Sequence, residues 1–346
     1  MATPPPLLTA VTSSSRHLLL LLRCISSAKM AQVRISADGI RISTDEGSVM
    51  EAFVVLEKAL FTTYKYQAPP SSHDDPADPS IFEISMTALL EILNIFSLSD
   101  PATTSKRPGA GNDPNDAFAA HRLHRHAGMN AFSNSTLGIT GTCTLTYEGE
   151  GSPLSIHMSE SDVTTTCDLT TYTASSTEEI PFARDRLALK TIIRSTNLLD
   201  TVSELSSLNP SEFTIQATST PSRASGANLT FTASGPLGSA NVDFTQNTAS
   251  DTPILETFFC PAKTEASFKF SLVKSAQRAM ATASKVSLRL DEEGVLSMQF
   301  LVEMEAASGI VGGSAAVAFV DFRVVPLVED ERAGNGLGEG GSGDED

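Results

Sequence analysis

Tryptophan is absent from this chain, and aromatic residues make up only 6% of its 346 residues. Apolar residues nevertheless reach 40%, which is enough to build a core in a chain long enough for two domains of ordinary size. The scarcity of aromatic rings argues against a core built on ring stacking. We therefore expect the core to be aliphatic.

Basic residues are also scarce, since 24 lysines and arginines stand against 41 aspartates and glutamates. The formal net charge of −17 excludes a positive field over the whole protein that could grip nucleic acid. It does not exclude a local basic face, so nucleic acid remains a candidate partner only for a limited surface.

Cysteine is rare, and its spacing carries no metal or redox motif. The four cysteines, Cys24, Cys143, Cys167 and Cys260, are dispersed, and none forms a CxxC pair. A chain of this length does not depend on disulfides for its stability. We expect reduced thiols in the core of a cytosolic or nuclear protein.

A long apolar run is missing too. The longest candidate, Leu18 to Leu22, is flanked by Arg16 and Arg23, whereas a helix that spans a bilayer needs about 20 apolar residues. Arg23 and Cys24 also interrupt the pattern of a signal peptide. We interpret the leucines as the buried face of a helix and expect no membrane partner.

Two stretches share one pattern, a short strand followed by a serine and an amphipathic helix. In the first, the strand 82–84 and the hinge Ser85 precede a helix with an apolar stripe at helical spacing, formed by Met86, Leu89, Leu90, Leu93 and Phe96. In the second, the strand 267–270 and the hinge Ser271 precede a helix over 272–283. The recurrence indicates a duplicated architecture.

The rest of the chain fits two copies of one half. Each half reads as a strand, a helix and three strands, and this order occurs twice in each half. The segment 33–43 reads as a hairpin, because apolar and polar residues alternate on both sides of an Asp-Gly turn. The predicted fold class is α+β, with two tandem domains, each a mostly antiparallel sheet with two helices on one face. The predicted domains are 1–169 and 188–328, joined by a linker over 170–187; an insertion over 99–136 and an acidic tail over 329–346 are expected to be disordered.

Several segments in this order resemble the PCNA-like family of DNA sliding clamps, and within it the Rad-one subunits of the nine-one-one DNA-damage checkpoint clamp. The segments are 39–43, 59–61, 82–96, 203–205, 285–289 and 294–300, and the resemblance covers about residues 7–327. No single segment is specific, so the resemblance depends on their order. The sequence departs from the family at 68–80 and 99–136, both of which fall between strands.

The resemblance implies a non-catalytic subunit of a heterotrimeric ring that encircles DNA in the nucleus. Its implied partners are two paralogous clamp subunits, a clamp loader, double-stranded DNA without sequence specificity, and checkpoint and repair proteins. No cofactor and no metal are implied. Subunits of such rings join through edge strands, and here the resemblance implies Val163, Thr165, Cys167 and Leu169 on one edge and Val242 and Phe244 on the other.

Basic residues on the helices that line a ring suffice to contact DNA phosphates. Arg16 and Arg23 lie seven residues apart and share a helix face, although Leu20 lies on the same face. Lys274 and Arg278 form an i, i+4 pair opposite an apolar stripe. We expect these four cations to face DNA; ordinary solvated surface charge is the alternative for each pair.

Other functions stay open at this point. A metal-dependent 3′→5′ exonuclease would need converging carboxylates, and the candidates are Asp45-Glu46, Asp74-Asp75, Glu178-Glu179 and Asp291-Glu292-Glu293. Such acids are also common in turns. His121, His124 and His126 have no visible fourth ligand for zinc, and with Arg122 and Arg125 they form a candidate DNA-contacting or targeting patch. A replicative homotrimeric clamp and a monomeric scaffold are the remaining alternatives.

Overall fold

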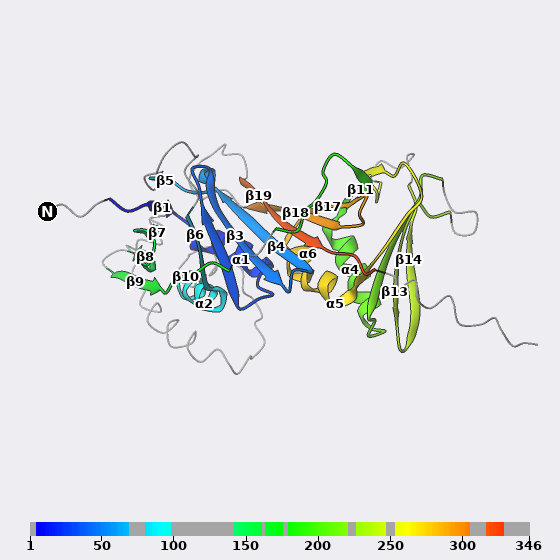
Figure 1. The fold of residues 1–346 in the computed structure, drawn as a ribbon, viewed down its shortest axis with the longest axis horizontal. Coiled ribbons are helices and arrows are strands. Elements are labelled where there is room, and N and C mark those ends of the chain that lie inside the picture. The colour runs from blue at the N-terminus through cyan, green and yellow to red at the C-terminus, as the bar shows by residue number, and fades with distance from the viewer. Residues whose placement is uncertain are drawn as a thin grey trace, which may run out of the picture.

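The computed structural model describes residues 5–68, 80–97, 142–160, 163–175, 179–220, 226–246, 253–304 and 316–328 (Figure 1). The predicted disorder of 99–136 and 329–346, and the histidines at 121–126, lie outside these residues. No helix in the described ranges has the length and apolar content needed to cross a membrane.

The N-terminal half, up to residue 169, repeats one order of elements. It consists of β1 (Leu8–Thr12), α1 (Ser15–Cys24), β2 (Met30–Ile35), β3 (Gly39–Glu46), β4 (Met50–Glu57), the 3-10 turn η1 (Lys58–Leu60), β5 (Thr63–Tyr66), β6 (Ser80–Ser85), α2 (Met86–Ser97), β7 (Thr142–Tyr147), β8 (Leu154–Glu160) and β9 (Val163–Leu169).

The remaining elements follow the same order after a short strand. They are β10 (Tyr172–Thr173), β11 (Leu187–Arg194), α4 (Ser195–Ser206), β12 (Glu212–Ala217), β13 (Leu229–Gly235), β14 (Gly238–Phe244), β15 (Thr257–Phe259), β16 (Thr264–Lys269), α5 (Phe270–Ser275), α6 (Gln277–Thr282), β17 (Lys285–Asp291), β18 (Leu296–Met304) and β19 (Ala316–Val324). We call the part from β11 to β19 the C-terminal half.

The strands form three antiparallel sheets rather than one sheet for each half. Their orders are β5-β1-β7-β8-β9, β10-β6-β2-β3-β4-β19-β18-β17-β11-β15 and β14-β13-β12-β16. The ten-stranded sheet joins the two halves because β4 pairs with β19, from Met50 opposite Val324 to Val54 opposite Val320. Hydrogen bonds between two backbones therefore cross the junction, which couples the halves more tightly than a linker alone.

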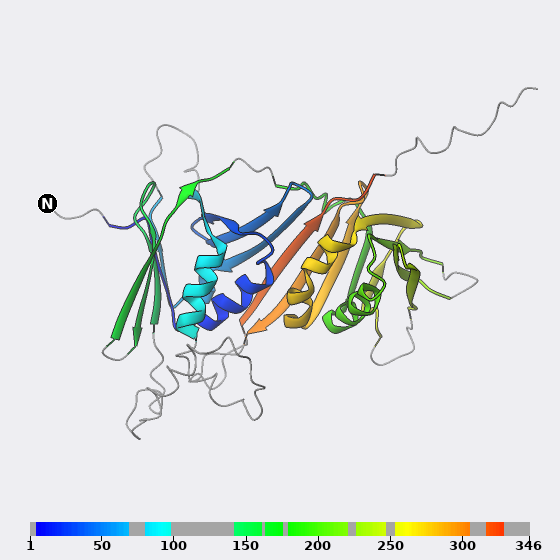
Figure 2. The same ribbon diagram turned by 90° about the horizontal axis from the view of Figure 1, so that it is seen from below.

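The helices cover one face of the ten-stranded sheet (Figure 2). They are adjacent in the order α2, α1, α6, α4, and α1 contacts both β4 and β19 at the junction. In α1, Leu18, Leu19, Leu21 and Leu22 are buried while Leu20 is exposed. The prediction that the leucine run is a buried helix face is confirmed.

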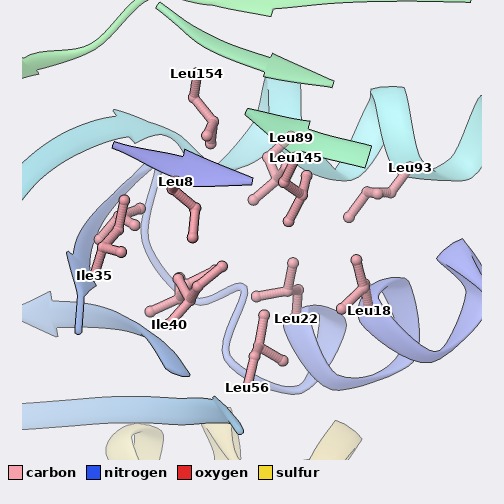
Figure 3. Close-up of a pocket in the computed structure, with 12 residues that line it drawn as sticks. Leu8, Leu18, Leu22, Ile35, Ile40, Leu56, Leu89, Leu93, Leu145 and Leu154 are labelled. Atoms are coloured by element: carbon pink, nitrogen blue, oxygen red, sulfur yellow. The ribbon is translucent and has the colours of Figure 1, made fainter. Parts of the chain in front are cut away.

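The core differs between the halves. Around α1 and α2 it is mostly aliphatic, although the buried rings of Phe82 and Tyr147 stack 4.4 Å apart. It contains a small cavity of about 20 Å³, lined by leucine, isoleucine and valine side chains such as Leu22 and Leu89 (Figure 3). The C-terminal half also buries mostly aliphatic residues, as predicted, but phenylalanine pairs add to its packing. The Phe213 and Phe231 rings lie 5.4 Å apart, and those of Phe300 and Phe322 lie 5.8 Å apart.

The second strand–serine–helix unit also differs from its prediction. Ser85 does precede α2, and its hydroxyl accepts a hydrogen bond from the Ala88 amide at 3.3 Å. Ser271, however, lies inside α5, because Phe270 already begins the helix and packs its ring 6.2 Å from Phe213. Position 269, not 271, is the equivalent of the hinge.

The predicted helix over 272–283 is broken at Ala276, whose φ and ψ are −79° and 1°. Just before the break, the Ser275 hydroxyl donates to the Leu272 carbonyl at 2.6 Å. A serine that bonds back to a preceding carbonyl competes with the regular helical pattern. Two short helices, α5 and α6, result.

Candidate functional site

Two of the predicted DNA-facing cations project from α1 on the helical face of the molecule. Arg16 and Arg23 are both exposed, and the exposed Leu20 lies between them, as the spacing indicated. The Arg23 guanidinium donates to Asn94 Oδ1 on α2 at 2.9 Å. This bond ties the first two helices together and fixes where the charge of Arg23 lies.

The other two cations also bridge helices. Lys274 Nζ donates to Ser206 Oγ at the end of α4, and Arg278 Nη1 donates to Ser26 Oγ just after α1, both at 2.8 Å. The break at Ala276 places Lys274 on α5 and Arg278 on α6, so they are not an i, i+4 pair of one helix. Both side chains are nevertheless exposed, and the Arg278 bond crosses between the two halves.

Acidic residues occupy the outer helices of the same row. Glu91 on α2 and Asp200 and Glu204 on α4 are exposed. Because α1 and α6 are neighbours in the middle of the row, Arg16, Arg23 and Arg278 lie at the centre of this face and the acids lie toward its ends, while Lys274 lies on α5 beside the end of α4. The resulting field would attract a polyanion along the central line, next to the junction of the two halves.

Each predicted interface segment ends a sheet. On β9, Leu169 is buried and Cys167 packs partly against the core, while Thr165 is exposed on that same face. Only the backbone of Val163 lies within the described residues. β9 pairs with β8 on one side, and its other side bonds to no strand among those described.

β14 ends the four-stranded sheet in the same manner. Phe244 is buried and Val242 packs partly against the core. β14 pairs with β13 from Leu229 opposite Phe244 to Gly235 opposite Gly238, and its other side pairs with no described strand. β9 and β14 lie at opposite ends of the molecule (Figure 1). At seven residues each, they are the longest strands that end a described sheet.

The predicted linker forms a clasp on the outer face of the ten-stranded sheet, which sequence reasoning missed. The Glu179 carboxylate lies 3.6 Å from the guanidinium of Arg34, 2.9 Å from that of Arg41 and 3.8 Å from that of Arg323. We call these four residues the linker clasp. Arg323 also donates to the Ile180 carbonyl at 2.7 Å, and the Ile180 side chain is buried. The signal in the sequence was a set of charged residues at alternate positions of strands that are otherwise apolar.

Two carboxyls beneath the clasp are buried. Glu51 bonds to Arg41 at 2.6 Å, and Asp321 lies 3.7 Å from Arg289. Burial raises the pKa of both carboxyls, and the nearby arginines oppose this shift without cancelling it. Burial also lowers the pKa of Arg289, whose guanidinium lies 5.6 Å from the centre of the Phe182 ring. These charges lie on β4, β17 and β19, next to the pairing of β4 with β19 at the junction.

Three of the carboxylates that could serve a nuclease, Asp45, Asp291 and Glu292, have structural partners. Asp45 accepts from the Ser48 amide at 3.2 Å in a turn, and Glu292 pairs with Arg186 at 3.3 Å. Asp291 is buried and accepts from the Val295 amide at 2.9 Å and the Ala183 amide at 3.2 Å. In the described part of the chain, no three side chains of histidine, cysteine, aspartate or glutamate gather as metal ligands. Asp74, Asp75 and Glu178 lie outside the described residues.

The cysteines match the expectation of core thiols. Cys24, Cys143 and Cys260 are buried, Cys167 is half-buried, and all four are free. Burial raises the pKa of the Cys143 thiol to about 12, so that thiol stays protonated at neutral pH.

Comparison with known proteins gives a family match across most of the chain. The family described as "Repair protein Rad1/Rec1/Rad17" matches residues 7–302. The chain is 26% identical over 307 residues to the DNA damage checkpoint control protein rad1 of Schizosaccharomyces pombe, covering 88% of this chain and 82% of that protein. It is 24% identical over 319 residues to the human cell cycle checkpoint protein RAD1, covering 92% and 91%.

A third relative carries the name of an enzyme. The DNA repair exonuclease REC1 of Mycosarcoma maydis is 26% identical over 315 residues, covering 74% of this chain and 67% of that protein. The relatives thus carry both checkpoint and exonuclease names.

Proposed function

Because this chain belongs to the Rad1/Rec1/Rad17 repair protein family, we propose that it is a non-catalytic subunit of a heterotrimeric ring clamp. Such a ring encircles DNA at damage sites in the nucleus and recruits checkpoint and repair factors. One observation carries the proposal: the helices line one face of a sheet shared by both halves, and β9 and β14, whose outer edges pair with no described strand, lie at opposite ends of the molecule. A DNA-damage checkpoint role agrees with the names of the relatives.

The proposed clamp domains are residues 1–169 and 188–328, joined by the linker 170–187. Their support is the repeated order of strand, helix and strands, and the position of the linker clasp on the side of the sheet away from the helices. The pairing of β4 with β19 then serves as the template for ring closure. In the repeated order of elements, β14 holds the place in the C-terminal half that β4 holds in the N-terminal half. In the same way, β9 of the N-terminal half corresponds to β19 of the C-terminal half. We expect β14 of one subunit to pair with the edge equivalent to β9 in the next.

The cations Arg16, Arg23, Lys274 and Arg278 are proposed to contact phosphates on the duplex inside the ring. Hydrogen bonds from Arg23, Lys274 and Arg278 to neighbouring elements hold these three charges in place on the helical face. Contacts to phosphate carry no sequence information, which suits a ring that stays on DNA by topology.

Native mass spectrometry of the chain mixed with two paralogous clamp subunits tests the assembly. A one-to-one-to-one complex that a clamp loader places on gapped circular DNA is the expected result. A stable homotrimer of this chain would favour a replicative clamp instead. A chain that stays monomeric with both partners would favour the scaffold without a DNA role.

An exonuclease is the second candidate, and the name of the Mycosarcoma maydis relative is the observation that favours it. The test is digestion of a labelled 3′ end by the purified chain with magnesium or manganese. Metal-dependent digestion that is lost on Asp45→Asn or Glu292→Gln would support catalysis. Without digestion, the proposal of a non-catalytic ring subunit stands.

A further inference from the structure

A serine marks the point at which the linker leaves the edge of the ten-stranded sheet. The two residues of β10 pair with β6, Tyr172 opposite Glu83 and Thr173 opposite Phe82. Ser175 follows and is exposed. A two-residue strand contributes little stability by itself, so the contacts of the next residues decide whether it stays attached.

Those contacts converge on one carboxylate. The Ser175 amide donates to Glu83 Oε1 at 2.8 Å, and the Ser175 hydroxyl donates to the same oxygen. On the next strand, Gln32 Nε2 donates to the Ser175 carbonyl at 3.4 Å. The side chain at position 175 thus contributes to the attachment as a hydrogen-bond donor that faces an acid.

The later part of the linker is attached independently. Glu179 is held by the three arginines of the linker clasp, and the Ala183 amide donates to Asp291 Oδ2. A change at Ser175 would thus release the beginning of the linker while its end stays on the sheet.

The sequence after Ser175 is Ser176, Thr177, Glu178 and Glu179. A hydroxyl followed three residues later by a carboxylate has the charge pattern that an acid-directed protein kinase would recognise, because a basic substrate groove attracts such a segment. The next carboxylate, Glu179, is held in the linker clasp. Of the three hydroxyl residues in this run, Ser175 alone lies among the described residues, and it is exposed on the outer face of the sheet.

We propose that Ser175 is a phosphorylation site that detaches the beginning of the linker from β6. The serine oxygen attacks the terminal phosphorus of a nucleoside triphosphate, the bond to the diphosphate breaks, and the hydroxyl proton is released. The product replaces a donor with an acceptor of about −1.5 to −2 charges. Directly opposite the Glu83 carboxylate, this charge turns an attractive contact into a repulsive one and leaves the Phe82 and Glu83 backbone without its β10 partner.

The first test is chemical. The full chain is incubated with a purified acid-directed protein kinase, magnesium and ATP, and the modified residue is located by mass spectrometry. We expect phosphate on Ser175 and its loss from the Ser175→Ala variant. Phosphate confined to Ser176 or Thr177, or none in the linker, overturns the proposal.

The second test measures detachment by chymotrypsin cleavage after Tyr172, with cleavage after Phe259 in the other half as the internal control. We expect cleavage after Tyr172 to be about tenfold faster in Ser175→Asp and only about twofold faster in Ser175→Ala, because aspartate adds repulsion to the lost bond. In a Glu83→Gln background, the two variants should be cleaved at equal rates. If Ser175→Asp is cleaved no faster than Ser175→Ala, the proposed detachment by charge is refuted. Cleavage of Ser175→Asp that is slower than that of the native chain, because Arg34 binds the new charge, would also refute it.

Discussion

Replacing Lys274 and Arg278 together by alanine tests whether the centre of the helical face contacts DNA. Both cations are exposed, and each donates a hydrogen bond to a serine on a neighbouring element, Lys274 to Ser206 and Arg278 to Ser26. The double variant removes two charges from the surface that the proposal places opposite the phosphates. It leaves Arg16 and Arg23 of α1 unchanged.

The magnitude follows from counterion release. Each phosphate contact contributes about −0.9 to the slope of log K against log salt concentration, so two lost contacts should reduce that slope by about 1.8. Between about 50 and 200 mM salt, these two contacts account for a change in affinity of roughly twelvefold. In the proposed ring the other subunits would also contact DNA, so binding should weaken without being abolished.

The assay is binding of the assembled heterotrimer to a labelled duplex, measured by fluorescence anisotropy across a salt series. A first control, Ser26→Ala with Ser206→Ala, removes the hydrogen-bond partners and keeps the cations, so its slope should equal that of the native ring. A second control, Lys65→Ala with Lys190→Ala, removes two exposed cations from strands and should also leave the slope unchanged.

Equal slopes for the native ring and the Lys274→Ala, Arg278→Ala variant would refute the reasoning, provided that both assemble and unfold at similar temperatures. A reduced slope in the second control as well would show that the contacts are spread over the whole surface. In that case, the helical face would have no special role in holding DNA.

Three further predictions concern stability. Gly39→Ala should lower the free energy of unfolding by about 2–3 kcal/mol in urea denaturation, because φ is +155° there and a Cβ would lie 2.3 Å from the Leu56 carbonyl oxygen; an unchanged midpoint would contradict this. Since burial raises the pKa of Glu51 and Asp321, native stability should fall as pH rises from about 4 through the raised values, and Glu51→Gln with Asp321→Asn should flatten that dependence; parallel stability curves would contradict it. Glu179→Ala should speed proteolysis of the linker yet cost less than about 1 kcal/mol, since its ion pairs are half-exposed; a larger loss on thermal unfolding would show that the clasp stabilises the junction itself.

Much of the secondary structure was predictable from local patterns. The alternation in β2 and β3 and the Asp-Gly turn between them are local signals, and both strands formed as expected. The helical stripe from Met86 to Leu93 was equally clear, and these two side chains are buried. The family resemblance added the expectation that β9 and β14 end their sheets, and the structure places them there.

Other features depend on residues far apart in the sequence. The pairing of β4 with β19 joins Val54 to Val320, and no local pattern specifies a partner at that distance. The linker clasp is of the same kind, because Glu179 lies near Arg34 and Arg323 only after the sheet has formed. A charge on a strand indicates an outward side chain but not the residue that meets it.

The sequence by itself determined which segments become strands and helices, because periodicity and turn residues act over a few neighbouring positions. It also placed Arg16, Arg23, Lys274 and Arg278 on helices. Only the tertiary structure decided that these helices share one face of a common sheet and that most of the buried phenylalanines lie in one half. These outcomes depend on which surfaces pack together, and packing is a property of the whole chain rather than of any one segment.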